Sequence, residues 1–134
     1  MTKLRWIALF YMVALLVAAS LNYIPGLTDA EGRAFGIFAL DIFDDLLHLV
    51  SALWAGIAAY LSSRAARSFL LYFGILYLGD GLLGLATGSG YLDLGILNYG
   101  IQDLPFGFKI LANLPHIALG GGAVLSAYLF RREA

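Results

Sequence analysis

Hydrophobic residues along the chain fall into four long runs, separated by polar or glycine-rich stretches. The runs extend over about residues 4–24, 35–61, 68–86 and 108–130. Each run is close to the roughly 20 apolar residues that an α-helix needs to cross the hydrocarbon core of a bilayer. Because lipid offers the backbone no hydrogen-bond partners, a spanning segment satisfies its own N–H and C=O groups as a helix. The pattern therefore predicts an all-α fold, an integral membrane four-helix bundle made of one transmembrane domain over residues 1–134.

The stretches between the runs contain residues that end helices. Pro25 and Gly26 follow the first run, and a Thr-Gly-Ser-Gly sequence at 87–90 follows the third. The polar stretch 62–67 predicts a short turn between the second and third spans. The longest connection, about residues 91–107, mixes aromatic and acidic residues. It predicts a short helix or a re-entrant piece at the membrane interface, where aromatic rings concentrate.

Composition agrees with a membrane protein and argues against several other classes. Hydrophobic residues make up 61% of the 134 residues, charged residues make up 13%, and the mean hydropathy is +0.85, whereas a soluble domain is about 25% charged. The net charge of -1 leaves no basic surplus for a nucleic acid partner. The absence of cysteine excludes disulfides, cysteine-ligated zinc and cysteine nucleophiles.

The basic residues lie almost entirely on one side of a four-span topology. Arg33 and Lys109 fall on the opposite side from the other six, which are Lys3, Arg5, Arg64, Arg67, Arg131 and Arg132. By the positive-inside rule, this distribution predicts cytoplasmic N- and C-termini, and we expect a multi-pass protein of a bacterial inner membrane. A cleaved signal peptide at the N-terminus is the competing interpretation, but the first apolar run is longer than a usual signal sequence.

Two stretches of the chain repeat the pattern Asp/Asn-x-x-His-x-x-x-small. One begins at Asp45 in the second span and the other at Asn113 in the fourth, and they hold the only two histidines, His48 and His116. The spacing predicts two helical-hairpin repeats, about residues 1–63 and 64–134. Both hairpins have the same orientation, which predicts parallel repeats around a pseudo-twofold axis along the membrane normal.

Helical spacing collects the polar residues of the spans on inward faces, toward the external side. At about 1.5 Å per residue, His48, His116 and Asp80 lie at one depth, and a second set lies one turn further out. That second set is Asp44, Asp45, Asn113 and Ser20, while Tyr77 shares the face of Asp80. Small residues, which let helices approach closely in lipid, occupy the same faces and are the predicted packing residues: Ala52, Gly84, Gly120 and Ala123. We therefore expect an outward-facing, buried Asp/Asn/His site.

The repeated motif resembles that of the domain of unknown function 4383 family of small bacterial four-helix membrane proteins. The family signature is Asn-x-x-His-x-x-x-Gly in the second and fourth helices. Asn113, His116 and Gly120 match it in full, whereas the first copy has Asp45 in place of Asn and Ala52 in place of Gly. The resemblance implies the four-helix topology, and it implies no activity.

Three functions are compatible with these polar residues. In the first, the chain is a structural or accessory membrane protein in which the histidines join the helices through hydrogen bonds, each worth about 0.6 kcal/mol. In the second, His48 and His116 bind haem b or a divalent metal, with Asp80 and Asp45 as further metal ligands. Neighbouring side chains would then orient the ligands: Asp44, Asn113, Tyr77 and Ser20. In the third, the titratable groups handle protons or a small ligand in a cavity open to the outside.

Enzyme chemistry has little support in the sequence. The serines lack a Gly-x-Ser-x-Gly elbow, and no catalytic residue is predicted. The lead interpretation is a structural or accessory protein of the lipid bilayer. The small-residue faces leave a homo-oligomer or a larger membrane complex open.

Overall fold

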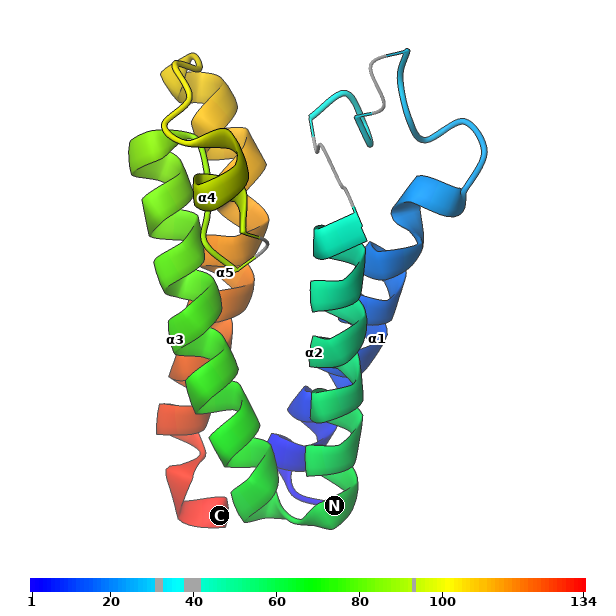
Figure 1. The fold of residues 1–134 in the computed structure, drawn as a ribbon. Helices are drawn as coiled ribbons and strands as arrows, with labels where there is room; N and C mark the ends of the chain where they lie inside the picture. The colour runs from blue at the N-terminus through cyan, green and yellow to red at the C-terminus, as the bar shows by residue number, and fades with distance from the viewer. Residues whose placement is uncertain (31–32, 38–41, 93) are drawn as a thin grey trace.

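Four long helices dominate the computed structural model, which describes residues 1–30, 33–37, 42–92 and 94–134 (Figure 1). The long helices are α1 (Lys3–Ser20), α2 (Ile42–Leu61), α3 (Ser63–Thr87) and α5 (Phe106–Leu129); the short pieces are η1 (Leu21–Tyr23), α4 (Gly95–Tyr99) and η2 (Arg131–Glu133). Each long helix has the length and the hydropathy to cross a membrane. An all-α, multi-pass membrane protein is thus confirmed.

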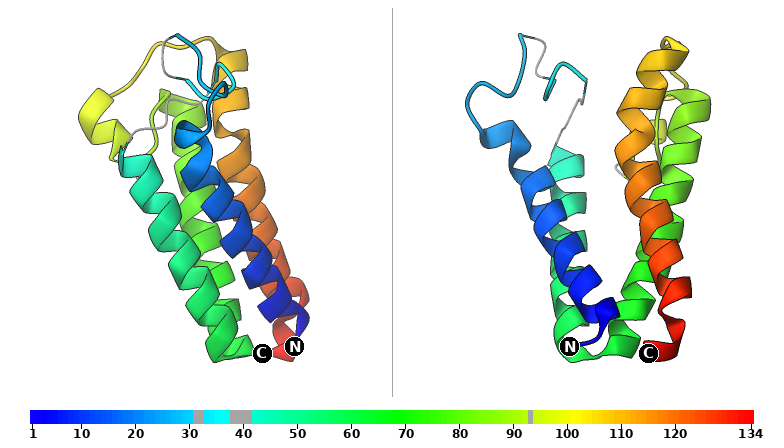
Figure 2. Two further views of the ribbon diagram at one scale, coloured as in Figure 1. Left: turned by 90° about the vertical axis from the view of Figure 1, so that its right-hand side faces the viewer. Right: turned by 180° about the vertical axis from the view of Figure 1, so that it is seen from behind.

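The helices form two pairs. α1 packs along α2, and α3 packs along α5, more extensively than any other helices in the described part of the chain. Both termini and the turn between α2 and α3 lie at one end of the molecule, which we call the terminal end (Figures 1 and 2). The pairs are closest there and spread apart toward the opposite end, the loop end, where the two long connections lie.

The second span begins later than the sequence pattern predicts. α2 starts at Ile42 rather than at residue 35, because the chain before it turns sharply: Phe35 and Gly36 have φ angles of 55° and 72°. Thr28 and Ala34 form an isolated β-bridge in the same connection. Residues 38–41 lie outside the described residues.

The third span begins earlier than predicted. Ser62 caps α3, and its side chain accepts a hydrogen bond from the amide of Ala65, as serine commonly does at a helix N-terminus. The polar stretch 62–67 is therefore mostly the first turn of α3 rather than a loop. At its other end, α3 stops at Gly88, whose φ of 83° is a left-handed conformation that glycine adopts without strain.

Aromatic rings fill the centre of the bundle on the terminal side of the histidines. Tyr11 of α1 lies 5.4 Å from Phe73 of α3 between ring centroids, and Phe73 stacks on Tyr77 at 4.0 Å. The Tyr11 hydroxyl donates a 2.6 Å hydrogen bond to the carbonyl of Leu119 in α5. One side chain thus joins α1 to both helices of the second pair.

Small residues allow α3 and α5 to approach each other closely. A Cβ added at Gly120 would lie 2.8 Å from the carbonyl oxygen of Gly74, and a Cβ added at Gly74 would lie 2.7 Å from that of Gly120. Gly84 has the side chain of Asn113 against it. Ala52 of α2 and Ala123 of α5 are also buried in the core.

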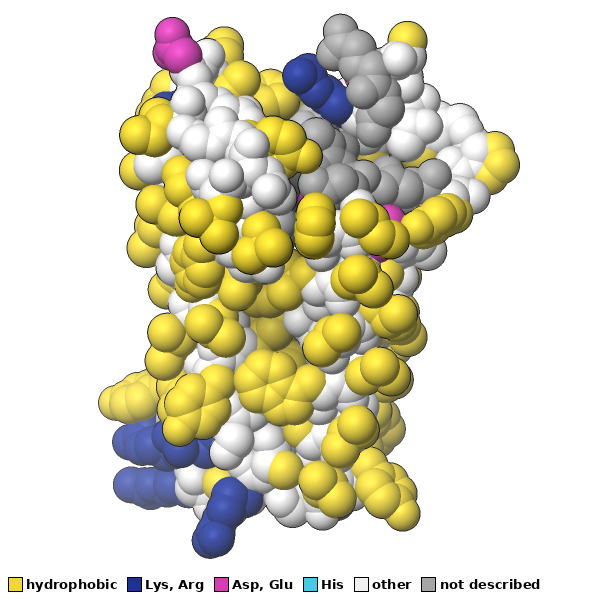
Figure 3. All heavy atoms as spheres, in the orientation of Figure 1, with side chains coloured by type: hydrophobic (Ala, Val, Ile, Leu, Met, Phe, Trp, Pro, Cys, Tyr) yellow, Lys and Arg dark blue, Asp and Glu magenta, His cyan; other side chains and the backbone are white. Residues whose placement is uncertain are grey.

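The surface has the polarity of a membrane protein. Hydrophobic side chains cover most of the face in Figure 3, and Lys and Arg side chains gather at the terminal end. Two arginines there also hold helix ends: Arg5 donates to the carbonyl of Ala59 at 2.6 Å, and Arg67 donates to that of Ala127 at 3.0 Å.

Candidate functional site

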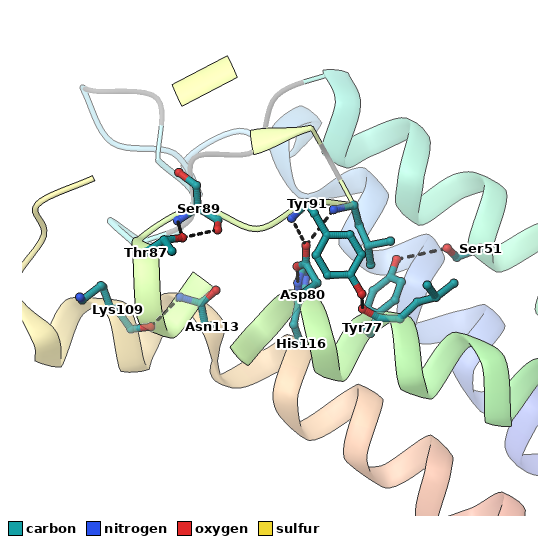
Figure 4. A network of polar contacts seen from close by, with 11 residues as sticks. Ser51, Tyr77, Asp80, Thr87, Ser89, Tyr91, Lys109, Asn113 and His116 are labelled. Atoms are coloured by element: carbon teal, nitrogen blue, oxygen red, sulfur yellow. Dashed lines mark hydrogen bonds and ion pairs between the residues drawn. The ribbon is translucent and has the colours of Figure 1, made fainter. Parts of the chain in front are cut away.

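Asp80 of α3 anchors the chain that follows the helix. Its carboxylate is buried, and Oδ1 accepts hydrogen bonds from the amides of Tyr91 and Leu92 at 2.8 and 2.9 Å (Figure 4). A side chain at Gly90 would collide with this carboxylate. The Tyr91 hydroxyl reaches further along α3 and donates to the carbonyl of Leu76 at 2.6 Å. The chain after Thr87 therefore folds back along α3 before the short helix α4 begins. We call this folded-back stretch, residues 88–92, the re-entrant segment.

The other oxygen of Asp80 binds His116 of α5. The distance from Oδ2 to Nδ1 is 2.5 Å, and the His116 side chain is 22% exposed. A carboxylate only accepts hydrogen bonds, so Nδ1 carries the hydrogen of this contact. That arrangement leaves Nε2 as the ring nitrogen that can accept a hydrogen bond or bind an ion.

The two histidines lie together between the helix pairs. The centroids of the His48 and His116 rings are 6.2 Å apart, and the rings are nearly perpendicular, at 84°. Tyr77 lies 5.1 Å from His116 between centroids, and its hydroxyl is 3.2 Å from the hydroxyl of Ser51 in α2. We call these five residues, His48, Ser51, Tyr77, Asp80 and His116, the histidine cluster.

The other predicted site residues lie apart from the cluster or face different partners. Asp45 accepts a 2.9 Å hydrogen bond from the hydroxyl of Tyr23 near the end of α1. Asn113 donates to the carbonyl of Lys109 in its own helix at 2.8 Å, and Ser20 donates to that of Val17 at 2.7 Å. Asp44 is buried on α2.

These positions limit what the residues can hold. Within the described residues, no three His, Asp or Glu side chains come together in a way that could hold a metal ion. The predicted set of His48, His116, Asp80 and Asp45 therefore does not converge on one point. The structure brings together the imidazoles of His48 and His116 and the carboxylate of Asp80, which is hydrogen-bonded to His116.

Three parts of the site are absent from the predicted site residues. Ser51 follows His48 by three positions, so helical spacing predicts that it shares the inward face of His48, but no role in the site was predicted for it. The only sequence feature that points to Tyr23 is its position near the expected membrane interface, where aromatic residues are enriched. The amides of Tyr91 and Leu92 had no signal at all, because every residue except proline has a backbone N–H.

A neighbouring carboxylate perturbs the phenol of Tyr23. Its hydrogen bond to the Asp45 carboxylate, together with the negative charge of Asp45 and partial desolvation, raises the pKa of Tyr23 above its usual value of 10.0. Ionising the phenol would place two negative groups in contact.

No curated protein and no solved structure matches the chain significantly. One family model matches residues 5–104, which extend from α1 through α4 and contain His48, Tyr77 and Asp80 but not α5. The match covers more than half of the chain, and the protein belongs to the family described as domain of unknown function (DUF4383).

Proposed function

We propose that the protein is an accessory membrane protein in which the histidine cluster, centred on Asp80, ties α3, α5 and the re-entrant segment into one unit. The observation that carries the proposal is Asp80. Its two oxygens bind α5 through His116 and the chain after α3 through the amides of Tyr91 and Leu92. A polar group at membrane depth is costly without partners, and here all three partners belong to the chain itself.

The proposal includes a topology. The two helix pairs are parallel repeats, about residues 1–63 and 64–134, and the termini are cytoplasmic in a bacterial inner membrane. Two features support it: the equivalent histidines His48 and His116 face each other, and six of the eight basic residues lie toward the termini and the α2–α3 turn. The chain has no cysteine, so single cysteines at Ser63 and at Ala30, which is exposed at the loop end, would report cleanly. An impermeant maleimide added to intact cells should label Ala30→Cys and not Ser63→Cys; the reverse result would overturn the topology.

Stability measurements in detergent test the accessory role. His116→Ala removes the hydrogen bond that joins α5 to Asp80, and we expect it to lower the free energy of unfolding by about 1–2 kcal/mol. Ser126→Ala is the control, because the Ser126 hydroxyl donates only to the backbone of its own helix, at the carbonyl of Gly122. If both variants are as stable as the parent protein, the cluster does not hold the bundle together.

A second candidate function has one specific observation in its favour. A metal–nitrogen bond is about 2.0–2.1 Å and the centroid of an imidazole ring lies about 1.1 Å behind its nitrogen. Two histidines in line on one ion therefore have centroids about 6.3 Å apart by this bond length. The separation of 6.2 Å between the two ring centroids falls within that reach. The Asp80 carboxylate on Nδ1 of His116 is also the usual partner of a metal-bound histidine.

Spectra and metal analysis of the purified protein separate the two candidates. A bis-histidine haem b gives a Soret band that sharpens on reduction, and a bound divalent metal gives a stoichiometric metal content. Either signal should disappear in both His48→Ala and His116→Ala. A colourless, metal-free protein from cells supplied with haem and metals would eliminate ligation, while a loss of stability in His116→Ala would still support the accessory role.

A further inference from the structure

A second polar site lies away from the histidine cluster, in a cleft between the loop ends of α1 and α2. The cleft has a volume of about 380 Å³ and is open on one side. Its apolar wall includes Leu16 of α1 with Leu46 and Leu49 of α2, and the exposed fractions of these side chains are 42%, 50% and 42%. All three belong to spanning helices, so the open side of the cleft faces the lipid.

One end of the cleft is polar and incompletely paired. Asp45 lines the cleft and is 8% exposed, and its Oδ2 accepts the hydrogen bond from Tyr23. Its Oδ1 has no hydrogen-bond partner in the part of the chain that the structure describes. A buried carboxylate oxygen without a hydrogen-bond donor destabilises the fold. A donor that enters the cleft would remove this cost.

The depth of Asp45 fits the head of a membrane amphiphile. At about 1.5 Å per residue, Asp45 lies roughly 4–5 Å inside the first residue of α2, and Leu49 lies about 6 Å deeper. Tyr23, beside Asp45, is an aromatic residue just beyond the end of a span, where such rings mark the interface. The polar end of the cleft is therefore at headgroup level, and its apolar wall continues toward the membrane centre.

The charge of the residues that line the cleft determines which kind of headgroup it can bind. Asp45 supplies a carboxylate, and the residues described along the cleft include no Lys or Arg. A phosphate or carboxylate head would meet a like charge without a counter-ion. An ammonium group carries positive charge and N–H donors and can satisfy Oδ1.

We infer that this cleft binds a single-chain amphiphilic amine, with its ammonium group on Asp45 and its hydrocarbon chain along Leu16, Leu46 and Leu49. The site is independent of the histidine cluster and of the function proposed for it. A ligand of this kind enters sideways from the lipid, through the open face. Tyr23 stays on Oδ2, so the ligand needs only the second oxygen.

Dodecylamine is a suitable probe, with dodecanol and dodecanoate as chain-matched controls. Binding is measured in nanodiscs of neutral lipid by the shift in thermal unfolding and by crosslinking of a diazirine-bearing alkylamine. We expect dodecylamine to stabilise the protein and the two controls not to. Asp45→Asn should weaken amine binding at least tenfold, whereas Asp103→Asn, at an exposed carboxylate outside the cleft, should leave it unchanged. The crosslinks should map to Leu16–Ser20 and Leu46–Leu49.

A second pair of variants keeps the test valid if Asp45→Asn does not fold. Leu46→Trp fills the cleft and keeps the carboxylate, while Leu53→Trp places the same ring two turns along the same face of α2, where the native leucine is 57% exposed. Amine binding should be lost in the first variant and retained in the second. Equal amine effects on Asp45→Asn and the parent protein, or dodecanoate binding as tightly as dodecylamine, would overturn the proposal.

Discussion

Replacing Asp80 with alanine should detach the re-entrant segment from α3 without unfolding the helices. The change removes one acceptor for three donors: the amides of Tyr91 and Leu92 and Nδ1 of His116. A hydrogen bond in a membrane protein contributes about 0.6 kcal/mol on average. A donor left buried without an acceptor costs about 1–3 kcal/mol.

These values bracket the expected effect. Three average bonds give roughly 2 kcal/mol as a lower limit. The upper limit is lower than the summed cost of three buried donors without acceptors. The amides of Tyr91 and Leu92 can hydrogen-bond to water once the segment moves away from α3. We therefore expect Asp80→Ala to lower the free energy of unfolding by about 2–4 kcal/mol. Asp80→Asn should lose roughly half as much, because its amide oxygen still accepts from the two backbone N–H groups.

Two measurements on the same samples check this reasoning. Unfolding in bicelles gives the free energy, and hydrogen exchange followed by mass spectrometry reports the amides of Tyr91 and Leu92. Exchange of these amides should accelerate in Asp80→Ala while amides in the middle of α3 remain protected. Asp103→Ala is the control, because it removes an exposed carboxylate from the same connection. Unchanged exchange at residues 91 and 92 would refute the role assigned to Asp80.

Three further predictions follow from single contacts. Gly120→Leu should destabilise the α3–α5 pair by about 1–3 kcal/mol through overpacking, whereas Gly121→Leu should have little effect, because a Cβ there meets open space. Unfolding in detergent compares the two variants, and equal losses of stability would contradict the close approach of α3 and α5. Tyr11→Phe should cost about 0.6–1.7 kcal/mol in the same assay, because it removes the hydrogen bond to α5, and no loss would show that this bond contributes nothing. Asp45 raises the pKa of Tyr23 above its usual value of 10.0, so the stability that Tyr23 adds relative to Tyr23→Phe should be complete below pH 10.0 and disappear as the pH rises through the raised pKa. A stability difference between the two proteins that persists above this pKa would argue against the hydrogen bond from Tyr23 to Asp45.

The hydrophobic pattern predicts the spans well because lipid leaves the backbone no alternative to a helix. It does not locate the start of α2, since Ala34 and Phe35 continue the apolar run while the chain still turns at Gly36. The turn depends on local conformation and on the bridge from Thr28 to Ala34. Hydropathy does not report either of these.

The candidate site shows a sharper limit of sequence reasoning. Asp45 and Asp80 are both acidic residues within spanning helices, and spacing alone groups them with the histidines. In the structure Asp80 faces His116, whereas Asp45 faces Tyr23. Which neighbour a carboxylate meets depends on helix rotation and on the path of the connections. A short motif contains neither kind of information.

The two halves of the proposed repeat also use their equivalent positions differently. The register that aligns His48 with His116 aligns Met12 of α1 with Asp80 of α3. Met12 packs against Gly56, where an added Cβ would lie 2.7 Å from its sulfur. The first pair thus has a thioether packing contact at the position where the second has a carboxylate bonded to its histidine. α3 holds His116 of its own pair through Asp80, whereas the equivalent position of α1 packs against α2. The two copies of the histidine motif therefore have different neighbours at this position, so the repeat alone does not assign both histidines the same role.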